Sequence, residues 1–213
     1  MIKNLRVHIV LILIAITSVM ASAQVKKNLK FQNKKFPTSL QDEVKEALSY
    51  FPELWQTKID FVFKDKIKNA VMQAQPRVRT LFKGKKTRTY KIKISRELQL
   101  GNMTKPIEEV PHEILVGWIA HELGHVMDYL DRSSFQMIGF GLNYITSKSF
   151  LMNSEYEADK HAISHGCANL IIKTKNYILN HDHLSDDYKA RIDQFYLSPE
   201  EVRSIEAELD SEG

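Results

Sequence analysis

The segment HELGH, residues 121–125, places two histidines four positions apart, with a glutamate directly after the first. Residues four apart in an α-helix differ by about 40° around the axis, so His121 and His125 would project from one face, about one turn apart. Both imidazoles could then hold one metal ion. Glu122 would lie near the same face and could act as a base on a metal-bound water. The motif therefore indicates a metal-dependent hydrolytic site.

The residues around this motif predict a buried helix whose first turn lies near Pro111. The helix is apolar on most sides, as a central helix is. Its apolar positions are Ile114, Leu115, Trp118, Ile119, Leu123, Val126, Met127 and Leu130. Two histidines and a glutamate cost free energy on such a helix unless something satisfies them. A zinc ion would satisfy all three, and a pair of core histidines bonded to the backbone is the alternative.

A catalytic zinc needs a third protein ligand and an open position for water. Asp131, six residues after His125, stands where metzincins place their third ligand. That class needs a glycine where this chain has Asp128, so that the chain turns sharply out of the helix. If the helix simply continues to residue 131, Asp131 points away from the histidine face. We therefore do not expect Asp131 to bind the metal.

The segment NSEYEADKHAISHG offers a better third ligand. Glu155 and Asp159 are four apart on a predicted helix that ends near Gly166. One carboxylate could coordinate zinc, while Asp159 could accept the second ring N–H of a histidine ligand and so fix its tautomer. A solvent-facing acidic helix, with Ser154 and Glu157 as a capping box, is the alternative.

The HELGH motif followed by EYEAD, residues 155–159, resembles the HtpX-like and CAAX-prenyl-protease-like gluzincin metallopeptidases, in particular their small soluble members, the minigluzincins. The resemblance covers roughly residues 38–180 and includes the order of the elements. It implies that one zinc ion is bound by His121, His125 and Glu155. It also implies that Glu122 is the general base and acid and that Asp159 braces a histidine.

In the family resembled, substrate lies extended against an edge strand above the zinc and adds a peptide strand by backbone hydrogen bonds. The matching residues here are Tyr90, Lys91, Ile92, Lys93, Ile94 and Ser95. Backbone recognition tolerates many sequences, so we expect a broad peptide preference. The sequence shows none of the transmembrane helices of the membrane-bound members, and their prenylated or membrane substrates are therefore not carried over.

The remaining patterns predict an α+β domain. The predicted elements are a helix over residues 39–51, a strand over residues 58–63, a short helix ending before Pro76, a β-hairpin over residues 77–95 that turns at Lys83-Gly84-Lys85, and a C-terminal helix after Ser198. We expect a small, mostly antiparallel sheet with an edge strand, packed on the central zinc-binding helix and a second, glutamate-bearing helix in a zincin-like arrangement.

Eight basic residues and no acidic residue lie between Arg77 and Lys93. Lysines on one face of a strand discourage pairing with other chains, as at positions 91 and 93. We interpret the cluster as a solvated strand face, with a patch for an anionic partner as the alternative.

The first 23 residues are typical of a secretory signal peptide. Lys3 and Arg6 precede an apolar stretch over residues 9–20, and Ala21-Ser22-Ala23 supplies the small-residue cleavage pattern. The stretch is shorter than the roughly 20 residues of a membrane anchor, so we expect no stable membrane span after cleavage. We predict an exported protein, periplasmic or secreted, with one domain over residues 24–213.

The mature chain has 28 basic and 26 acidic residues, a near balance that does not favour a nucleic-acid partner. Its single cysteine, Cys167, cannot close an internal disulfide, and we expect it to be buried in the tail of a helix.

The function that we expect is zinc-dependent endopeptidase activity on extended peptides or unfolded proteins. An inactive zinc-containing binding or assembly factor, and a metal-free packing domain, are the alternatives. A donor for the oxyanion is also needed. Its candidates are Tyr129, Tyr144, Tyr156, His165, His181 and His183. The last two could instead cap the zinc as a fourth ligand, although surface histidines in a turn are the favoured interpretation.

Overall fold

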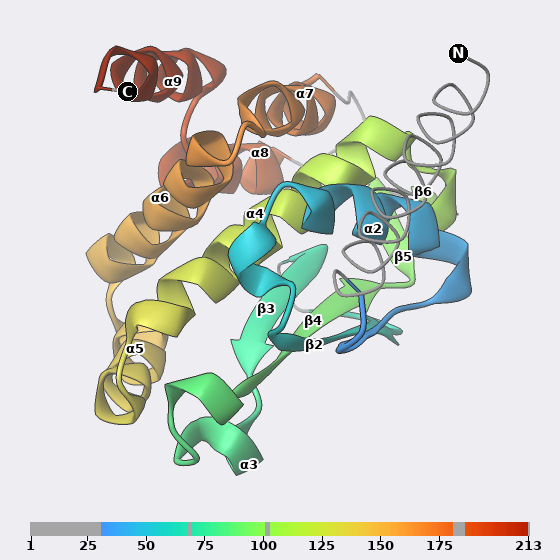
Figure 1. Cartoon of the computed structure of the whole chain (residues 1–213). Coiled ribbons are helices and arrows are strands. Elements are labelled where there is room, and N and C mark those ends of the chain that lie inside the picture. The colour runs from blue at the N-terminus through green and yellow to red at the C-terminus, as the bar shows by residue number, and fades with distance from the viewer. Residues whose placement is uncertain (1–30, 68–69, 101–102, 181–185, 213) are drawn as a thin grey trace, which may run out of the picture.

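A small sheet lies on one side of a long central helix in the computed structural model, and further helices cover the other side (Figure 1). The structure describes residues 31–67, 70–100, 103–180 and 186–212. The strands are β1 (Lys34–Lys35), β2 (Lys58–Lys64), β3 (Met72–Pro76), β4 (Thr89–Ser95), β5 (Glu97–Leu100) and β6 (Met103–Pro106). The α-helices are α2 (Gln41–Ser49), α3 (Val78–Leu81), α4 (His112–Asp131), α5 (Ser134–Thr146), α6 (Lys148–Ser164), α7 (Ala168–Leu179), α8 (Asp186–Phe195) and α9 (Pro199–Glu212). Short 3-10 turns are η1 (Thr38–Leu40), η2 (Pro52–Leu54), η3 (Lys85–Thr87) and η4 (Ile107–Glu109).

The fold is α+β, as predicted, but the four-stranded sheet is mixed. Its strand order is β1-β2-β4-β3, and β5 and β6 form a separate antiparallel pair. Strand β2 runs parallel to both β1 and β4, whereas β3 runs antiparallel to β4. The prediction of a mostly antiparallel sheet was therefore wrong for this sheet. The reason is that β4 lies between β2 and β3. After β2 the chain crosses over to form β3 at the edge of the sheet, and it then returns as β4, which pairs parallel with β2.

The predicted hairpin over residues 77–95 was also wrong in its first arm. Residues 78–81 form the helix α3, and β3 pairs with β4 in their place. The Thr80 hydroxyl accepts a hydrogen bond from the Thr89 amide at 3.0 Å and donates one to the Arg77 carbonyl at 3.0 Å. Such local side-chain bonds compete with a strand ladder and favour a turn. The short helix expected before Pro76 is likewise the strand β3.

Other predicted elements are confirmed. The first helix is present as η1 followed by α2, and the strand over residues 58–63 is β2. Helix α6 ends at Ser164, and Gly166 follows with a φ of 80°, a backbone conformation that favours glycine at a helix end. The Ser198 hydroxyl accepts a hydrogen bond from the Glu201 amide at 3.2 Å, which caps α9 at its predicted start.

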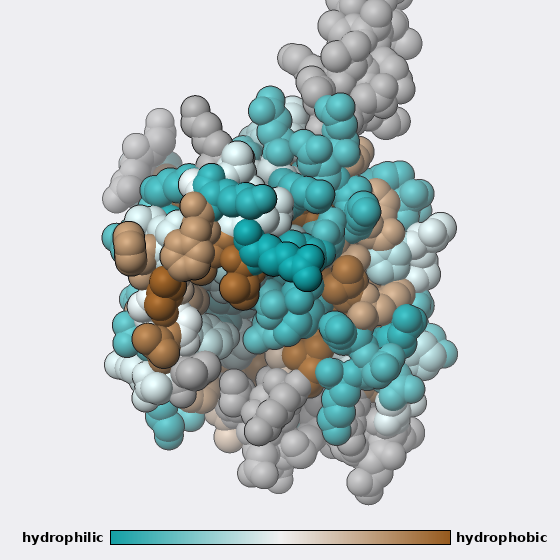
Figure 2. Space-filling model, turned by 90° about the horizontal axis from the view of Figure 1, so that it is seen from below, coloured by the Kyte–Doolittle hydropathy of each residue, from teal (hydrophilic) through white to brown (hydrophobic). Residues whose placement is uncertain are grey.

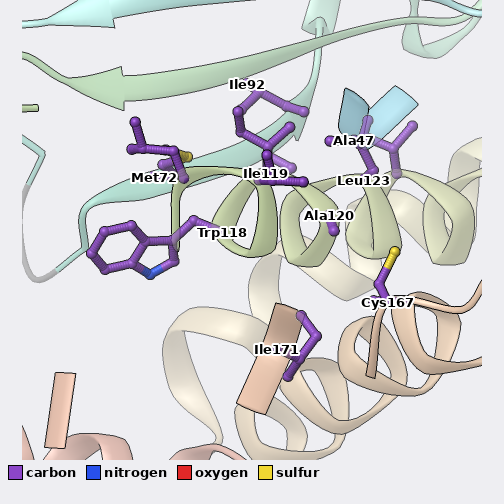
Figure 3. Close-up of a cluster of buried hydrophobic side chains, with 14 of the residues drawn as sticks. Ala47, Met72, Ile92, Trp118, Ile119, Ala120, Leu123, Cys167 and Ile171 are labelled. Carbon is purple, nitrogen blue, oxygen red and sulfur yellow. The ribbon is translucent and has the colours of Figure 1, made fainter. Parts of the chain in front are cut away.

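Helix α4 is the centre of the core, as its apolar pattern predicted. Figure 3 shows Ile92 and Met72 of the sheet on one side of this helix, and Cys167 and Ile171 on the other. All four side chains are buried. Cys167 is buried as expected, but it lies in the turn immediately before α7 and not in the tail of α6.

Two glycines let other helices approach α4 closely. A Cβ atom at Gly124 would lie 2.1 Å from the carbonyl oxygen of Ala158 in α6. A Cβ atom at Gly117 would lie 2.5 Å from the carbonyl oxygen of Leu170 in α7. These distances are far below van der Waals contact with a rigid backbone. Glycine at the two positions therefore sets how near α6 and α7 can pack.

Within the described ranges, none of the helices combines the length and the apolar character that a membrane span needs. The predicted signal peptide, residues 1–23, lies outside the described residues.

We expect Gly124→Ala to destabilise the protein by about 1–3 kcal/mol or more, because α6 must move away from the added methyl group. Gly139→Ala in α5 is the control, since a Cβ atom there meets nothing within 4 Å and alanine is the better helix former. The measurement is the free energy of unfolding in urea. Equal stability of the two variants would contradict the packing role of Gly124.

His112 at the start of α4 lies between two glutamates of α2. Its Nδ1 is 2.9 Å from Glu43 and its Nε2 is 2.7 Å from Glu46. The bonds to Glu46 and Glu43 raise the pKa of His112. We expect the interaction of protonated His112 with the two glutamates to stabilise the fold fully below about pH 6.5, the ordinary histidine pKa. This stabilisation is lost as the pH rises through the raised pKa of His112.

The contribution of His112 to the free energy of unfolding is modest, no more than about 1 kcal/mol, because this histidine is partly exposed. It is measured as the difference in unfolding free energy between wild type and His112→Gln across neutral pH. A difference that grows with rising pH would show the opposite sign and refute this assignment.

Candidate metal site

Helices α4 and α6 bring two histidines and a glutamate together. The Nε2 atom of His121 lies 3.0 Å from Oε2 of Glu155, and the Nε2 atom of His125 lies 3.4 Å from the same oxygen. One potential ligand atom from each of the three residues lies within 4.8 Å of the other two. All three side chains are buried. The two helices therefore converge on one small volume of nitrogen and oxygen donors.

The spacing of these atoms fits a shared metal ion. Two ligands at about 2.0–2.1 Å from a tetrahedral zinc lie roughly 3.3 Å apart. The distances of 3.0 and 3.4 Å are close to this value. The cluster of His121, His125 and Glu155 could thus hold a metal ion with little movement of the helices.

Asp159 lies one turn further along α6 and contacts His121 from the other side of the ring. Its Oδ1 is 2.8 Å from Nδ1 of His121, and its Oδ2 accepts a hydrogen bond from Nζ of Lys175 at 2.7 Å. Glu155 and Asp159 are each only 1% exposed, so the alternative of a solvent-facing acidic helix was wrong. Nor is Ser154 the helix cap, because α6 begins earlier, with Ser147 as its N-cap.

His125 is held by packing more than by hydrogen bonds. Its ring stacks on Tyr129, with centroids 6.0 Å apart, and meets the ring of His121 edge-on at 4.8 Å. Its Nδ1 atom is buried and has no hydrogen-bond partner among the described residues. The two histidines are therefore supported differently, His121 by a carboxylate and His125 by an aromatic ring.

Glu122 lies beside the cluster, and its Oε2 accepts a hydrogen bond from the backbone amide of Ala74 in β3. Burial raises the pKa of Glu122, against the opposing effect of His125 and His121. A glutamate with a raised pKa is suited to accept and return a proton near neutral pH. Glu122 is the only member of the HELGH motif that touches the sheet through a hydrogen bond in the described residues.

The buried charges form a connected set. Burial disfavours the charged form of His121, but Asp159 and Glu155 outweigh it and raise its pKa to about 10. The pKa of Asp159 is lowered despite burial, because Lys175 and His121 stabilise the carboxylate. In the absence of a metal a proton on His121 thus balances the carboxylates. Metal binding must displace that proton.

These residues line a cavity of about 660 Å³ between the sheet and the helices. Strand β3 forms one wall with residues 70–76. Apolar side chains of α5, α7 and α8 form much of the remainder, among them Met137, Phe140, Ile171, Ile178 and Ile192. The size and lining suit part of a peptide or another small ligand.

The strand beside the cavity is β3 and not β4. Residues Tyr90 to Ser95 were predicted to be an exposed edge strand that binds substrate, but β4 is paired with β2 on one side and β3 on the other. Its backbone therefore cannot add a further strand. The two faces of β4 differ, since Tyr90, Ile92 and Ile94 are fully buried while Lys91 and Lys93 are half-buried.

Strand β3 is the edge strand of the sheet beside Glu122. The Arg77 amide donates to the Thr89 carbonyl, and the Ser95 amide donates to the Val71 carbonyl. In an antiparallel ladder the residues alternate, so the amide and carbonyl of Ala74 point away from β4. This agrees with the bond from the Ala74 amide to Glu122 and with the Tyr129 hydroxyl 3.5 Å from the Ala74 carbonyl.

Three further side chains stand at the cavity. Tyr144 of α5 donates a hydrogen bond to Oε1 of Glu155 at 2.9 Å, and it was among the predicted oxyanion donors. Lys175 and Tyr196 also line the cavity, and neither was predicted from the sequence. The signal in the sequence was Lys175, which stands among apolar residues in the segment ANLIIKTKNYIL. A lysine is rarely buried unless it is paired, so its position indicated a buried partner.

The other predicted donors are placed as follows. Tyr129 lines the cavity, whereas Tyr156 is exposed and does not. His165 stacks on Phe51 and contacts Glu53, away from the cluster. His181 and His183 lie outside the described residues.

Comparison of the chain with protein-family models, with curated proteins and with solved structures finds no match. The assignment of the site therefore depends on its residues and their geometry.

We expect Asp159→Asn to lower the affinity of the site for a divalent metal ion, with zinc as the probe, about 10–100-fold, because the variant removes the carboxylate that orients His121. It also leaves the buried Lys175 without its anionic partner. Glu157→Gln on the same helix is the control, since Glu157 does not line the cavity. Affinity is measured by competition with a chromophoric chelator, with circular dichroism as the test of folding. Equal affinities of the two variants would contradict this role of Asp159.

Proposed function

We propose that this protein is a zinc-dependent endopeptidase of the gluzincin type, with a zincin-like arrangement of its sheet and two helices. The observation that carries the proposal is the position of the Glu155 carboxylate, 3.0 and 3.4 Å from the two histidines of the HELGH motif. Glu122 lies beside them at the edge of the sheet. The resemblance of the motifs to HtpX-like gluzincins supports the same proposal.

The donor set favours zinc. Two imidazole nitrogens and one carboxylate oxygen form the ligand set of many catalytic zinc sites, whereas calcium and magnesium prefer oxygen ligands. The adjoining cavity leaves room for a water molecule and a substrate. When bound, a zinc ion in such a site lowers the pKa of its water and polarises a carbonyl group.

The side chains divide the remaining work. Glu122 takes the proton of the attacking water and passes it to the leaving amine. Asp159 keeps Nε2 of His121 directed at the cluster, because it holds the opposite ring nitrogen. Tyr144 fixes the orientation of Glu155 through its other carboxylate oxygen. Tyr129 is the candidate to stabilise the oxyanion, since it lines the cavity and its hydroxyl makes only a long contact, of 3.5 Å, to the Ala74 carbonyl.

The substrate that fits is a peptide in extended conformation. Strand β3 is the edge of the sheet that lines the cavity, and the backbone groups of Met72 face away from β4 in the same direction as those of Ala74, whose amide is already bonded to Glu122. A peptide that pairs with this edge would place its backbone along the cavity. Because backbone groups supply the recognition, we propose extended peptides or unfolded proteins as the substrate class. The signal peptide expected in residues 1–23 would direct this activity outside the cytoplasm, to a periplasm or the medium.

We expect Glu122→Gln to retain zinc and to lower peptide hydrolysis by about 10²–10⁴-fold, because glutamine cannot accept the proton of the water. The measurement is cleavage of a mixed peptide library by the zinc-loaded variant, with metal content determined by elemental analysis. Glu113→Gln is the control, because it makes the same change on the exposed surface of α4. Unchanged turnover in Glu122→Gln would remove Glu122 from this role.

Two other results would change the proposal. Stoichiometric zinc in the wild type without cleavage of any peptide would support an inactive zinc-containing binding or assembly factor. Absence of bound zinc, after purification without chelators and addition of the metal, would support a metal-free packing domain.

A further inference from the structure

Helix α5 presents an apolar face to solvent. Phe135, Ile138 and Leu142 lie three and four residues apart on it and are 82%, 41% and 59% exposed. The helix has no charged residue along its length, SFQMIGFGLNYIT. Its opposite face is buried and lines the cavity through Met137 and Phe140. Helix α5 is therefore apolar on both sides, with one side covered and the other open.

The short helix α3 extends this surface. Val78 and Phe82 of this region are 78% and 68% exposed. The Ser134 hydroxyl at the start of α5 donates a hydrogen bond to the carbonyl of Leu81, next to Phe82, at 2.5 Å. This bond joins the two helices. We define the apolar patch as five residues: Val78, Phe82, Phe135, Ile138 and Leu142. Figure 2 views the molecule from this side and shows apolar side chains gathered on one part of the face, beside hydrophilic ones.

The border of the apolar patch is basic. Arg79, Lys83 and Lys85 are exposed in and after α3, and no acidic residue lies between positions 77 and 93. Lys85 reaches the end of α4, where its Nζ donates to the carbonyl of Asp131 at 2.6 Å. The exposed carboxylate of Asp131 is the acidic group nearest in sequence to α5, and the next residue is Arg132. In the segments that carry the apolar patch and in the residues next to them, exposed cations therefore outnumber exposed anions.

We propose that the apolar patch and the basic side chains Arg79, Lys83 and Lys85 form a docking surface for an anionic membrane. Apolar side chains of a surface helix enter the boundary between headgroups and acyl chains, while arginine and lysine beside them attract anionic lipids. The exposed aromatic rings of Phe82 and Phe135 supply apolar area for this insertion. The contact would be peripheral, since no described helix can span a membrane.

The charge of the border distinguishes a membrane from a second copy of the chain. A twofold contact through the apolar patch would bring the same surface from each copy together. Arg79 and Lys83 of one copy would then approach those of the other, and like charges at an interface disfavour association. An anionic lipid surface is complementary to both the cations and the apolar side chains. The inference does not depend on the proposed hydrolysis.

The test is co-sedimentation of the chain with vesicles of phosphatidylcholine, with and without phosphatidylglycerol. We expect binding to the anionic vesicles, weaker binding to the neutral ones, and loss of binding at high salt. Phe135→Ser/Leu142→Ser and Arg79→Glu/Lys83→Glu should each lower the partition coefficient by about tenfold or more. Wild type and variants carry the same N-terminus, so any contribution of residues 1–30 is common to all.

Lys160→Glu/Arg203→Glu is the matched control, because it makes the same charge change on α6 and α9, both outside the apolar patch. This variant should bind close to the wild-type level, and circular dichroism checks that every variant is folded. Absence of vesicle binding, equal binding to neutral vesicles, or wild-type binding by the two patch variants would each overturn the inference. The inference would also be overturned if the wild type bound no vesicles and formed a dimer that the Phe135→Ser/Leu142→Ser variant does not form.

Discussion

The candidate site depends on the close approach of two helix backbones where Gly124 of α4 meets Ala158 of α6. With any side chain at position 124, the two helices would have to separate, since even a methyl carbon would lie 2.1 Å from the Ala158 carbonyl. Glu155 and Asp159 sit on either side of Ala158, and both reach His121. The glycine of the HELGH motif is thus a spacing residue, while its histidines and glutamate carry the chemistry. Gly117 has the same function toward α7, which carries Lys175.

Three residues of the candidate site, His121, Glu155 and Glu122, are each held by a partner from a different element. Asp159 holds His121, Tyr144 of α5 holds Glu155, and the Ala74 amide of β3 holds Glu122. The bonds to His121 and Glu122 are buried and the bond to Glu155 is partly buried, so each is shielded from competing water and restricts its side chain to one orientation. Such restriction is what a binding or catalytic site requires before a ligand arrives. Helix α4 supplies the motif, but three other elements, α5, α6 and β3, set its geometry.

Helices α2, α4, α6 and α9 and the candidate metal ligands were predicted from the sequence because their signals are local, whereas α5, α7 and α8 were not predicted. Residues four apart on a helix share a face, which is how Glu155 and Asp159 could be paired with the two histidines. The sheet was less predictable. Strand β3 has the sequence MQAQP, in which no residue favours a strand, and its conformation depends on pairing with β4 and on contacts between Ala74 and α4. Conversely, polar and apolar residues alternate in RVRTLF, residues 77–82, as they do in a strand. Side-chain hydrogen bonds of Thr80 nevertheless stabilise a helical turn there. Lys175 and Tyr196 were missed because no local pattern links them to the motif.

Lys175 also bears on which ions the cluster can accept. Three carboxylates, those of Glu122, Glu155 and Asp159, are buried around one buried ammonium group. With both imidazoles neutral and the carboxylates ionised, an ion of charge +2 brings this set to electroneutrality. A monovalent ion would leave an uncompensated negative charge in a low-dielectric interior, and a trivalent ion would leave a positive one. The ammonium group of α7, which need not touch the metal, therefore contributes to the charge balance of the site.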